Sequence, residues 1–420
     1  MALFSPVFER IVETGAVTVI DKRGKPHEFG DGSGRRTVMR FTDRVQDWKL
    51  LANPYLYFGE AYTDGSVVFE EGSLYDFLET VGRNAVKAQR AVSGPLARGV
   101  TQMRRRIEQH NPLRIARKNV AHHYDLNGRL YDLFLDKDRQ YSCAYFGSGN
   151  DTLEVAQDSK KRHLAAKLLL EPGQKVLDIG SGWGGLALYL AQVAQVDVTG
   201  VTLSEEQHKL SNKRAKDLKL DRRVRFHLRD YREDDGHYDR IVSVGMFEHV
   251  GAKHFAEYFD KVRELLTDDG VFVLHSIGRM EPPGTTNPWL RKYIFPGGYT
   301  PALSETMAAI ENAGLWVTDI EILRLHYAKT LREWNRRFQA NRDTVEAMYD
   351  ARFCRMWEFY LYGTEMVFEE AEEMVFQLQL AHKRDAVPIT RDYIAERQRQ
   401  FRAWEAEREA PIRRIASSGD

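Results

Sequence analysis

The sequence predicts an α/β protein in which a Rossmann-like parallel sheet carries helices on both faces, preceded by a smaller domain of mixed α+β structure. Two observations support the large sheet. From about Leu164 onward, short β-rich segments alternate with amphipathic helical segments, and a glycine-rich turn follows the first of these strands. A third observation supports the separate domain, because one helical stripe and two strand-like segments precede residue 85.

Size and composition indicate a globular protein with more than one domain. The chain has 420 residues, of which 43% are hydrophobic and 29% are charged. Its 61 basic and 61 acidic residues cancel, so the overall charge gives no sign of a nucleic-acid partner. The two cysteines, Cys143 and Cys354, are too few for a disulfide framework and favour the reduced cytosol.

The N-terminal segment lacks the pattern of a secretory leader. Glu9 and Glu13 interrupt it early, whereas a signal peptide needs an unbroken apolar core. No apolar run is long enough to cross a bilayer. We therefore expect a cytoplasmic protein and expect any membrane contact to be peripheral, at the inner face.

Residues 1–85 are expected to form a lipid-docking domain. Strands are predicted from Ala16 to Ile20 and from Arg36 to Thr42. A helical apolar stripe precedes them, formed by Phe4, Val7, Phe8, Ile11 and Val12. Residues 86–118 are expected to form a basic helical linker, because ten positive charges and only one negative charge lie between Arg83 and Lys118. Such a stretch is usually a solvated surface, but at an anionic membrane each residue that reaches the lipid contributes up to ~1 kcal/mol.

Residues 119–420 are expected to form the main domain. Its predicted strands run over Lys175–Ile179, Val196–Val201, Val224–Leu228, Tyr238–Val244 and Val271–Ser276. Its predicted helices run over Leu186–Val193, Ser204–Lys219, Phe255–Leu266 and Leu303–Ala313. Two further strands are predicted over Trp316–Leu323 and His326–Thr330, followed by an aromatic helical tail from Thr344 to Leu380.

The glycine-rich turn indicates a nucleotide-containing ligand. Gly180, Gly182 and Gly184 follow the strand at 175–179, and glycine is used where backbone approaches a ligand closely. The turn also fits a dinucleotide fingerprint, so it does not decide the ligand alone. S-adenosylmethionine is favoured because Asp178 suits the ammonium end of that ligand. The second strand also lacks the terminal acid that a nicotinamide enzyme uses to hold ribose.

Two later segments are candidates for the rest of this site. Thr202, Leu203 and Gln207 follow the second strand and are expected to face the ligand, although Ser204 with Gln207 also matches a helix capping box. Asp230 and Tyr231 follow the third strand and offer an acid for an adenine amino group and a ring to pack on it. A surface turn is the alternative for that pair.

Six segments, in order along the chain, resemble the cyclopropane fatty acid synthase family, which includes the mycolic acid cyclopropane synthases. The segments are His122–Leu126, Gln140–Phe146, Val201–Gln207, Met246–Gly251, Leu274–Gly278 and Lys292–Gly298. The resemblance implies a class I methyltransferase fold, S-adenosylmethionine as cofactor, and Tyr141 and Ser142 among the cofactor-binding residues. We expect no metal site, and the oligomeric state is left open, a homo-oligomer included. The N-terminal part looks like that of the phospholipid-acting members, which implies an unsaturated phospholipid of an anionic membrane as substrate.

The resemblance also implies a bound bicarbonate ion beside the transferred methyl group. The positions that match its binding set are Cys143, Glu248, His275, Ile277 through its backbone, and Tyr327. In this chemistry the alkene attacks the sulfonium methyl, and a base then removes a proton from the new methyl to close a cyclopropane ring. A strong nucleophile would trap the carbocation, so a weakly nucleophilic oxyanion in a dry pocket suits the task.

Each of these residues has a structural alternative. Cys143 is also suited to be a small buried residue, His275 a core histidine and Tyr327 a packing residue. Glu248 is harder to explain structurally, because an acid among apolar neighbours is costly to bury. The aromatic tail is either ordinary core or the lining of an acyl tunnel whose rings stabilise the cation.

The sequence departs from the family in one respect. Some bacterial members carry a cysteine in the aromatic helix, where this chain has Thr364, so no covalent cysteine role is carried over. The loop from Glu281 to Trp289 has no confident counterpart. Alternative functions with the same fold are formation of a methyl- or methylene-branched fatty acid and methylation of a small molecule. A non-catalytic lipid-binding protein is the alternative from a different class.

Overall fold

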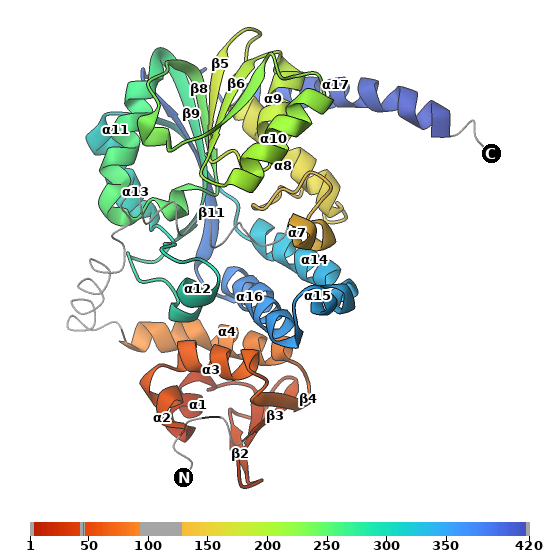
Figure 1. Cartoon of the computed structure of the whole chain (residues 1–420). Helices are drawn as coiled ribbons and strands as arrows, with labels where there is room; N and C mark the ends of the chain where they lie inside the picture. The colour runs from red at the N-terminus through yellow and green to blue at the C-terminus, as the bar shows by residue number, and fades with distance from the viewer. Residues whose placement is uncertain (1–3, 43–44, 46, 93–127, 417–420) are drawn as a thin grey trace.

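The computed structural model describes residues 4–42, 45, 47–92 and 128–416. Figure 1 shows a small N-terminal sheet with its helices at one end of the molecule and a larger sheet at the other. A layer of helices lies between the two sheets. The basic stretch is described only as far as Val92, so most of the predicted linker and the segment His122–Leu126 lie outside the described residues.

The N-terminal domain is built on a four-stranded sheet in the order β2-β1-β3-β4. Strand β1 pairs in parallel with β3, and the other two pairings are antiparallel. The strands are β1 (Ala16–Ile20), β2 (Pro26–Phe29), β3 (Arg36–Phe41) and β4 (Val67–Glu71). The helices are α1 (Ser5–Ile11), α2 (Asp47–Ala52), α3 (Pro54–Thr63) and α4 (Leu74–Val92). The domain boundary expected at residue 85 falls inside α4. Gly82 is tolerated within this helix, and the next glycine or proline in the sequence is Gly94.

The apolar stripe of the N-terminal helix packs inside the small domain, so it is not the surface through which the expected lipid-docking domain would contact a membrane. Phe4, Phe8 and Val12 are at most 2% exposed and pack against Phe29 and Phe41 of the small sheet. A small domain has few apolar residues with which to fill its core, so the residues of this stripe form part of that core.

The main domain contains a seven-stranded sheet in the order β10-β11-β9-β8-β5-β6-β7. The strands are β5 (Lys175–Ile179), β6 (Asp197–Thr202), β7 (Val224–Leu228), β8 (Tyr238–Val244), β9 (Leu266–Arg279), β10 (Trp316–Ile322) and β11 (Glu373–Ala381). Strands β5 to β9 pair in parallel, whereas β11 is antiparallel to both of its neighbours.

Helices cover both faces of this sheet, as the alternation in the sequence predicts. Helices α11 (Phe255–Leu265) and α13 (Leu303–Ala313) pack on one face, where Leu177 and Ile179 of β5 point. On the other face, β5 presents Val176 to a core shared by α8 (Leu153–Lys167), α9 (Gly185–Ala194), α10 (Glu205–Asp217) and α17 (Asp392–Ala416). Alternate residues of a strand point to opposite faces, so one short strand supplies both cores.

A third apolar core lies beyond the carboxyl ends of the strands, between the two domains. Large rings fill it, including those of Phe134, Trp334 and Trp357. The helices around it are α7 (Gly128–Phe134), α12 (Pro288–Tyr293), α14 (His326–Ala340), α15 (Arg342–Met348) and α16 (Ala351–Glu370). Three short 3₁₀ helices complete the domain, namely η1 (Tyr231–Glu233), η2 (Phe247–His249) and η3 (Ala252–His254).

Two element predictions are wrong. The strand predicted over His326–Thr330 is the start of α14, whose buried residues Tyr327, Leu331, Trp334 and Phe338 recur at helical spacing. The helical tail predicted to Leu380 ends at Glu370, and β11 then enters the sheet between β9 and β10. Apolar and polar residues alternate in this strand from Phe376 to Leu380, but the helical interpretation of the tail extends across that signal.

The N-terminal domain docks on α12 and α16. Gly59 of α3 leaves room for two rings, since a Cβ there would lie 2.6 Å from Trp289 and 2.9 Å from Phe359. Glu60 accepts hydrogen bonds from Lys292 (2.6 Å) and Tyr293 (3.0 Å). The small domain therefore contacts two helices that also line the second of the two cavities described below.

Candidate functional site

A cavity of about 160 Å³ opens at the carboxyl ends of β5, β6 and β8, where ligands bind in sheets of this kind. Ten of the eleven predicted cofactor residues line it: Tyr141, Ser142, Asp178, Gly180, Gly182, Thr202, Leu203, Gln207, Asp230 and Tyr231. They come from the loop before α8, from β5 and the turn after it, from the end of β6 and the start of α10, and from the start of η1. The sequence segments that carry the prediction are thus brought together at one place.

The turn after β5 combines an open backbone with a buried acid. Gly182 has φ +52°, and a Cβ built on it would meet no described atom within 4 Å, so the space beside it is left for a ligand. Asp178 is 2% exposed, and its Oδ2 has no hydrogen-bond partner among the described residues. Burial raises the pKa of Asp178 to about 7, while the charge of Lys160 lowers it. A cationic ligand group would satisfy this oxygen.

The segment after β6 both caps a helix and forms part of the cavity wall. Ser204 accepts a hydrogen bond from the Gln207 amide and so caps α10. The reciprocal half of a capping box is missing, because the side chain of Gln207 bonds the Thr202 hydroxyl (2.8 Å) instead. Thr202 and Gln207 are thereby held together on the cavity wall.

The acid after β7 is already partnered. Both oxygens of Asp230 accept from the guanidinium of Arg232, each at 2.9 Å, and Oδ1 also accepts from the Arg232 amide. A ligand amino group would share this carboxylate with Arg232. Tyr231 is buried and contacts Tyr258 edge-on.

Gly184 is the one predicted cofactor residue that does not line the cavity. A Cβ there would lie 2.7 Å from the ring of Phe226 and 2.8 Å from Ser211. The missing side chain allows α9, α10 and β7 to pack closely, so the glycine serves packing.

A second cavity of about 130 Å³ lies next to the first, and its exposed lining is mostly apolar. All five residues of the predicted bicarbonate set line it: Cys143, Glu248, His275, Ile277 and Tyr327. They are contributed by the loop before α8, by η2, by β9 and by α14. Phe295, Leu290 and Phe368 add apolar surface.

Glu248 is the buried acid of this cavity. Its Oε1 accepts from the amide of Ile277 at 2.7 Å, and its Oε2 has no hydrogen-bond partner among the described residues. Burial raises the pKa of Glu248 to about 7, against the opposing effect of the Ile277 amide. Near neutral pH the group therefore exists in both protonation states.

His275 is neutral, because burial holds its pKa well below the usual value. Its Nδ1 lies 3.1 Å from the side-chain nitrogen of Gln377. If that amide donates to Nδ1, the imidazole proton is on Nε2. Burial also raises the pKa of Cys143, so this residue is a thiol, which donates weakly to the Ala144 carbonyl (3.3 Å). Tyr327 contacts Phe368 and Trp334 through its ring.

The two cavities share a wall formed by Tyr141, Ser142, Gly245 and His249. Burial lowers the pKa of His249 to about 4, so its imidazole is neutral. A group held at this wall would face both cavities. Ligands held in the two cavities would therefore meet at this wall.

A family model described as mycolic acid cyclopropane synthetase matches residues 112–378, more than half of the chain. The chain belongs to this family. Its predicted resemblance to the cyclopropane synthases is thereby confirmed, and so is the Rossmann-like class I methyltransferase fold with helices on both faces.

Individual relatives agree with this family. The probable fatty acid methyltransferase of Pseudomonas putida is 42% identical over 259 residues, covering 60% of this chain and 66% of that protein. The cyclopropane-fatty-acyl-phospholipid synthase of Escherichia coli (strain K12) is 41% identical over 256 residues, covering 61% and 65%. A crystal structure of a mycolic acid cyclopropane synthase complexed with SAH and CTAB has a TM-score of 0.60 and 33% identity, covering 63% of this chain and 97% of that one. The chain thus matches just under two thirds of each of the two curated relatives.

Sequence reasoning missed two notable residues, one that lines both cavities and one that lies behind their wall. His249 adjoins Glu248 in a segment already singled out, and its place in the shared wall follows from the tight turn of η2. Lys160 is fully buried beneath the loop that carries Ser142, although lysine is rarely buried and nothing in the sequence marks it. Thr364 lines the second cavity, whereas Cys354 does not.

Two features are absent from the described part of the chain. It contains no group of three or more His, Cys, Asp or Glu side chains arranged to hold a metal ion. It also contains no helix long and apolar enough to span a membrane.

Proposed function

We propose that this chain is an S-adenosylmethionine-dependent enzyme that transfers a methylene unit to the cis double bond of an unsaturated acyl chain, forming a cyclopropane fatty acid. The observation that carries the proposal is the pair of adjoining cavities, one with the predicted cofactor residues and the other apolar with a buried acid. Family membership and the names of the relatives support it.

The first cavity fits the cofactor. When bound, S-adenosylmethionine supplies an electrophilic methyl group on a sulfonium sulfur. Asp178 offers its unpartnered oxygen to the ammonium end, and the open backbone at Gly182 leaves room beside it. Tyr231 provides a ring, and the Thr202–Gln207 pair provides polar atoms, at the nucleoside end.

The second cavity fits a small oxyanion with hydrogen-bonding oxygens. When bound, bicarbonate supplies a weakly nucleophilic base close to the methyl group. Protonated Glu248 has its Oε2 free of other bonds to donate to such an ion, because Oε1 is engaged by the Ile277 amide. His275 adds a donor when its Nε2 carries the proton, and the Cys143 thiol and the Tyr327 hydroxyl complete the set.

The apolar lining supports an acyl chain as the second ligand. Leu290, Phe295 and Phe368 exclude water from the cavity, which protects a carbocation from capture. Ring faces such as that of Tyr327 also stabilise positive charge at short range. These side chains do no covalent chemistry, and their role is to hold the chain and keep the site dry.

We further propose an intact phospholipid of an anionic membrane as the substrate, reached from the cytoplasmic side by peripheral contact. The buried N-terminal stripe is not available for this contact, but α2 and α3 expose Trp48 (61%), Leu51 (42%) and Tyr55 (62%) beside Lys49. Aromatic rings flanked by a lysine suit the interface of an anionic bilayer. The basic stretch up to Lys118 adds positive charge to the same part of the sequence.

The direct test incubates the protein with S-adenosylmethionine and vesicles of mono-unsaturated anionic phospholipid, then identifies the acyl products by mass spectrometry. We expect a cyclopropane product from the wild type and a loss of at least tenfold in turnover for Glu248→Gln, because an amide is a weaker donor than a protonated carboxyl group and cannot exchange a proton with the ion. Cys354→Ser is the matched control, since Cys354 is buried outside both cavities. Wild-type turnover by Glu248→Gln would remove Glu248 from the mechanism.

A methyl- or methylene-branched fatty acid is the second candidate product. It is favoured by one observation, the name of the Pseudomonas putida relative. The products are separated by mild hydrogenation before mass analysis, because a methylene branch takes up hydrogen and a cyclopropane resists it. A complete lack of S-adenosylmethionine turnover would instead favour a non-catalytic lipid-binding protein.

A further inference from the structure

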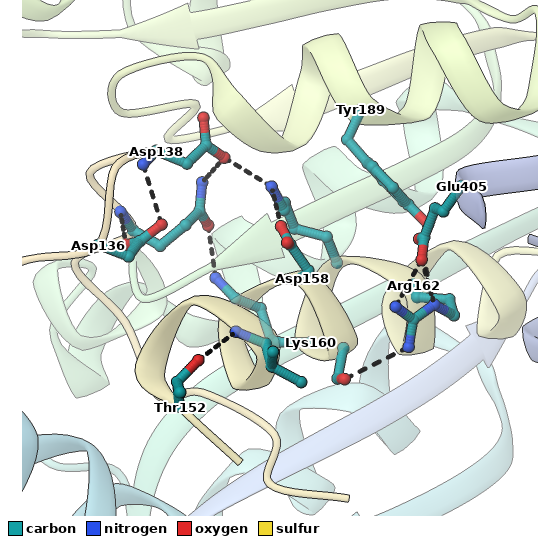
Figure 2. Close-up of polar contacts among 12 residues, drawn as sticks. Asp136, Asp138, Thr152, Asp158, Lys160, Arg162, Tyr189 and Glu405 are labelled. Carbon is teal, nitrogen blue, oxygen red and sulfur yellow. Dashed lines mark hydrogen bonds and ion pairs between the residues drawn. The ribbon is translucent and has the colours of Figure 1, made fainter. Parts of the chain in front are cut away.

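Lys160 is a buried cation that the proposed chemistry does not use. It lies on α8 with 0% exposure, and its Nζ donates to Gln140 Oε1 (2.5 Å) and Ser142 Oγ (2.9 Å). Figure 2 shows Lys160 extending from α8 toward the loop that carries Asp136 and Asp138. Both acceptors are neutral groups on the loop that leads into the two cavities.

The other buried lysines of α8 have carboxylate partners. Lys161 pairs with Asp138 (2.8 Å) and Asp158 (3.0 Å), and Lys167 pairs with Asp319 and Glu321. Within the described residues, no carboxylate oxygen comes within 4.0 Å of Lys160 Nζ. Burial lowers the pKa of Lys160 to about 8, while the more distant Asp136 raises it. A buried charge without a close counter-charge is costly, so an anionic ligand nearby would be stabilised.

Ser142 connects this charge to the ligand space. Its Oγ accepts from Lys160, so its own hydroxyl proton must be donated elsewhere, and the residue lines both cavities. The loop is held in place by Gln157, whose Nε2 donates to the carbonyl oxygens of Ser142 (2.9 Å) and Gln140 (3.2 Å). The hydroxyl is therefore a fixed donor with a positive charge behind it.

The methionine end of the proposed cofactor carries two opposite charges. Asp178 is suited to the ammonium group and lies close enough to Lys160 for that charge to lower its pKa. The carboxylate then needs a donor on the same side of the cavity. We propose that Lys160 is a positioning residue that directs the Ser142 hydroxyl to the carboxylate of S-adenosylmethionine. This inference rests on the proposed function.

The test measures the affinity for two ligands by calorimetry, namely S-adenosylhomocysteine and its decarboxylated analogue. The analogue keeps the adenosine, the sulfur and the ammonium group but lacks the carboxylate. We expect Lys160→Met to weaken binding of S-adenosylhomocysteine at least tenfold and to change binding of the analogue less than twofold. In turnover, the KM for S-adenosylmethionine should rise more than kcat falls.

Lys161→Met is the matched control, because it removes a buried lysine from the next position of the same helix. It should leave the ratio of the two affinities unchanged. Ser142→Ala provides a second route if Lys160→Met fails to fold, and it should reproduce the selective loss. Where both variants fold, the double variant should lose little more than either single one.

Three outcomes would overturn the inference. Equal weakening of both ligands by Lys160→Met would assign the lysine to structure alone. If Lys160→Met binds S-adenosylhomocysteine like the wild type but requires a higher bicarbonate concentration for turnover, the charge of Lys160 acts on the second cavity. Failure of the wild type to bind either ligand would instead overturn the proposed function, and this inference with it.

Discussion

Replacing Gly182 with alanine tests whether the turn after β5 is shaped by a ligand. The residue has φ +52°, where a side chain costs roughly 1–2 kcal/mol, partly offset by about 0.4–1 kcal/mol from a less flexible unfolded chain. The new methyl group would meet no described atom, so the fold should lose only about 1 kcal/mol. In the occupied cavity the methyl would overlap the ligand, and crowding of this kind costs about 1–3 kcal/mol, or roughly 5- to 150-fold in affinity.

Gly173 supplies the control for this prediction. It also has a positive φ (+83°) and open space around it, but it lies in the turn before β5, away from the cavity. Gly173→Ala should therefore lose similar stability in urea unfolding and bind S-adenosylhomocysteine like the wild type in calorimetry. The reasoning is refuted if Gly182→Ala binds this ligand with wild-type affinity, because the space beside the glycine would then belong to no ligand.

Three further predictions concern charge and the membrane. Burial raises the pKa of Asp178 from 3.8 to about 7, so the ligand-free protein should lose up to ~4 kcal/mol of unfolding free energy as the pH rises from about 4 to above 7. Asp178→Asn should make that slope shallower in urea titrations without abolishing it, because burial also raises the pKa of Glu248 and of Glu373 to about 7. A slope equal to that of the wild type would contradict the assigned burial cost. Trp48→Ser should weaken sedimentation with anionic vesicles severalfold, whereas Trp316→Ser, also exposed but on β10, should not; equal effects would exclude α2 as a docking surface. Serine in place of the arginines at 104–106 should lower binding to anionic vesicles and leave binding to neutral ones unchanged, and wild-type binding at low salt would make this stretch a spacer.

The sequence was sufficient where local pattern determines structure. The strand–glycine turn–helix unit at 175–194 has its signal in adjacent residues, and α13 matches its predicted bounds of Leu303–Ala313. Strand β11 was missed because the aromatic helical pattern before it was extended to Leu380, although apolar and polar residues alternate from Phe376 to Leu380. The burial of the N-terminal apolar stripe was also not predictable, because the apolar face of an amphipathic helix can contact either a membrane or the core of a small domain.

The candidate site divides in the same way. Residues in recognisable segments, such as Asp178 and Glu248, could be selected from the sequence, and the fold brings them to cavity walls. Lys160 could not, since its importance comes from a hydrogen bond to Ser142 across 18 positions and from burial that only the packed helix creates. The role of Gly184 in packing likewise depends on Phe226, which is distant in sequence.

The contact at Gly59 gives natural variation a way to alter the second cavity without touching its ligand. Trp289 and Phe359 meet edge-to-face with their ring centroids 4.6 Å apart, and each belongs to a helix that also lines or adjoins the cavity. A larger residue at position 59 would displace these rings, since a Cβ alone would already clash. If the second cavity holds an acyl chain, as we propose, the preferred chain length can change through substitutions in the N-terminal domain, and a comparison restricted to the residues around the ligand would overlook their origin.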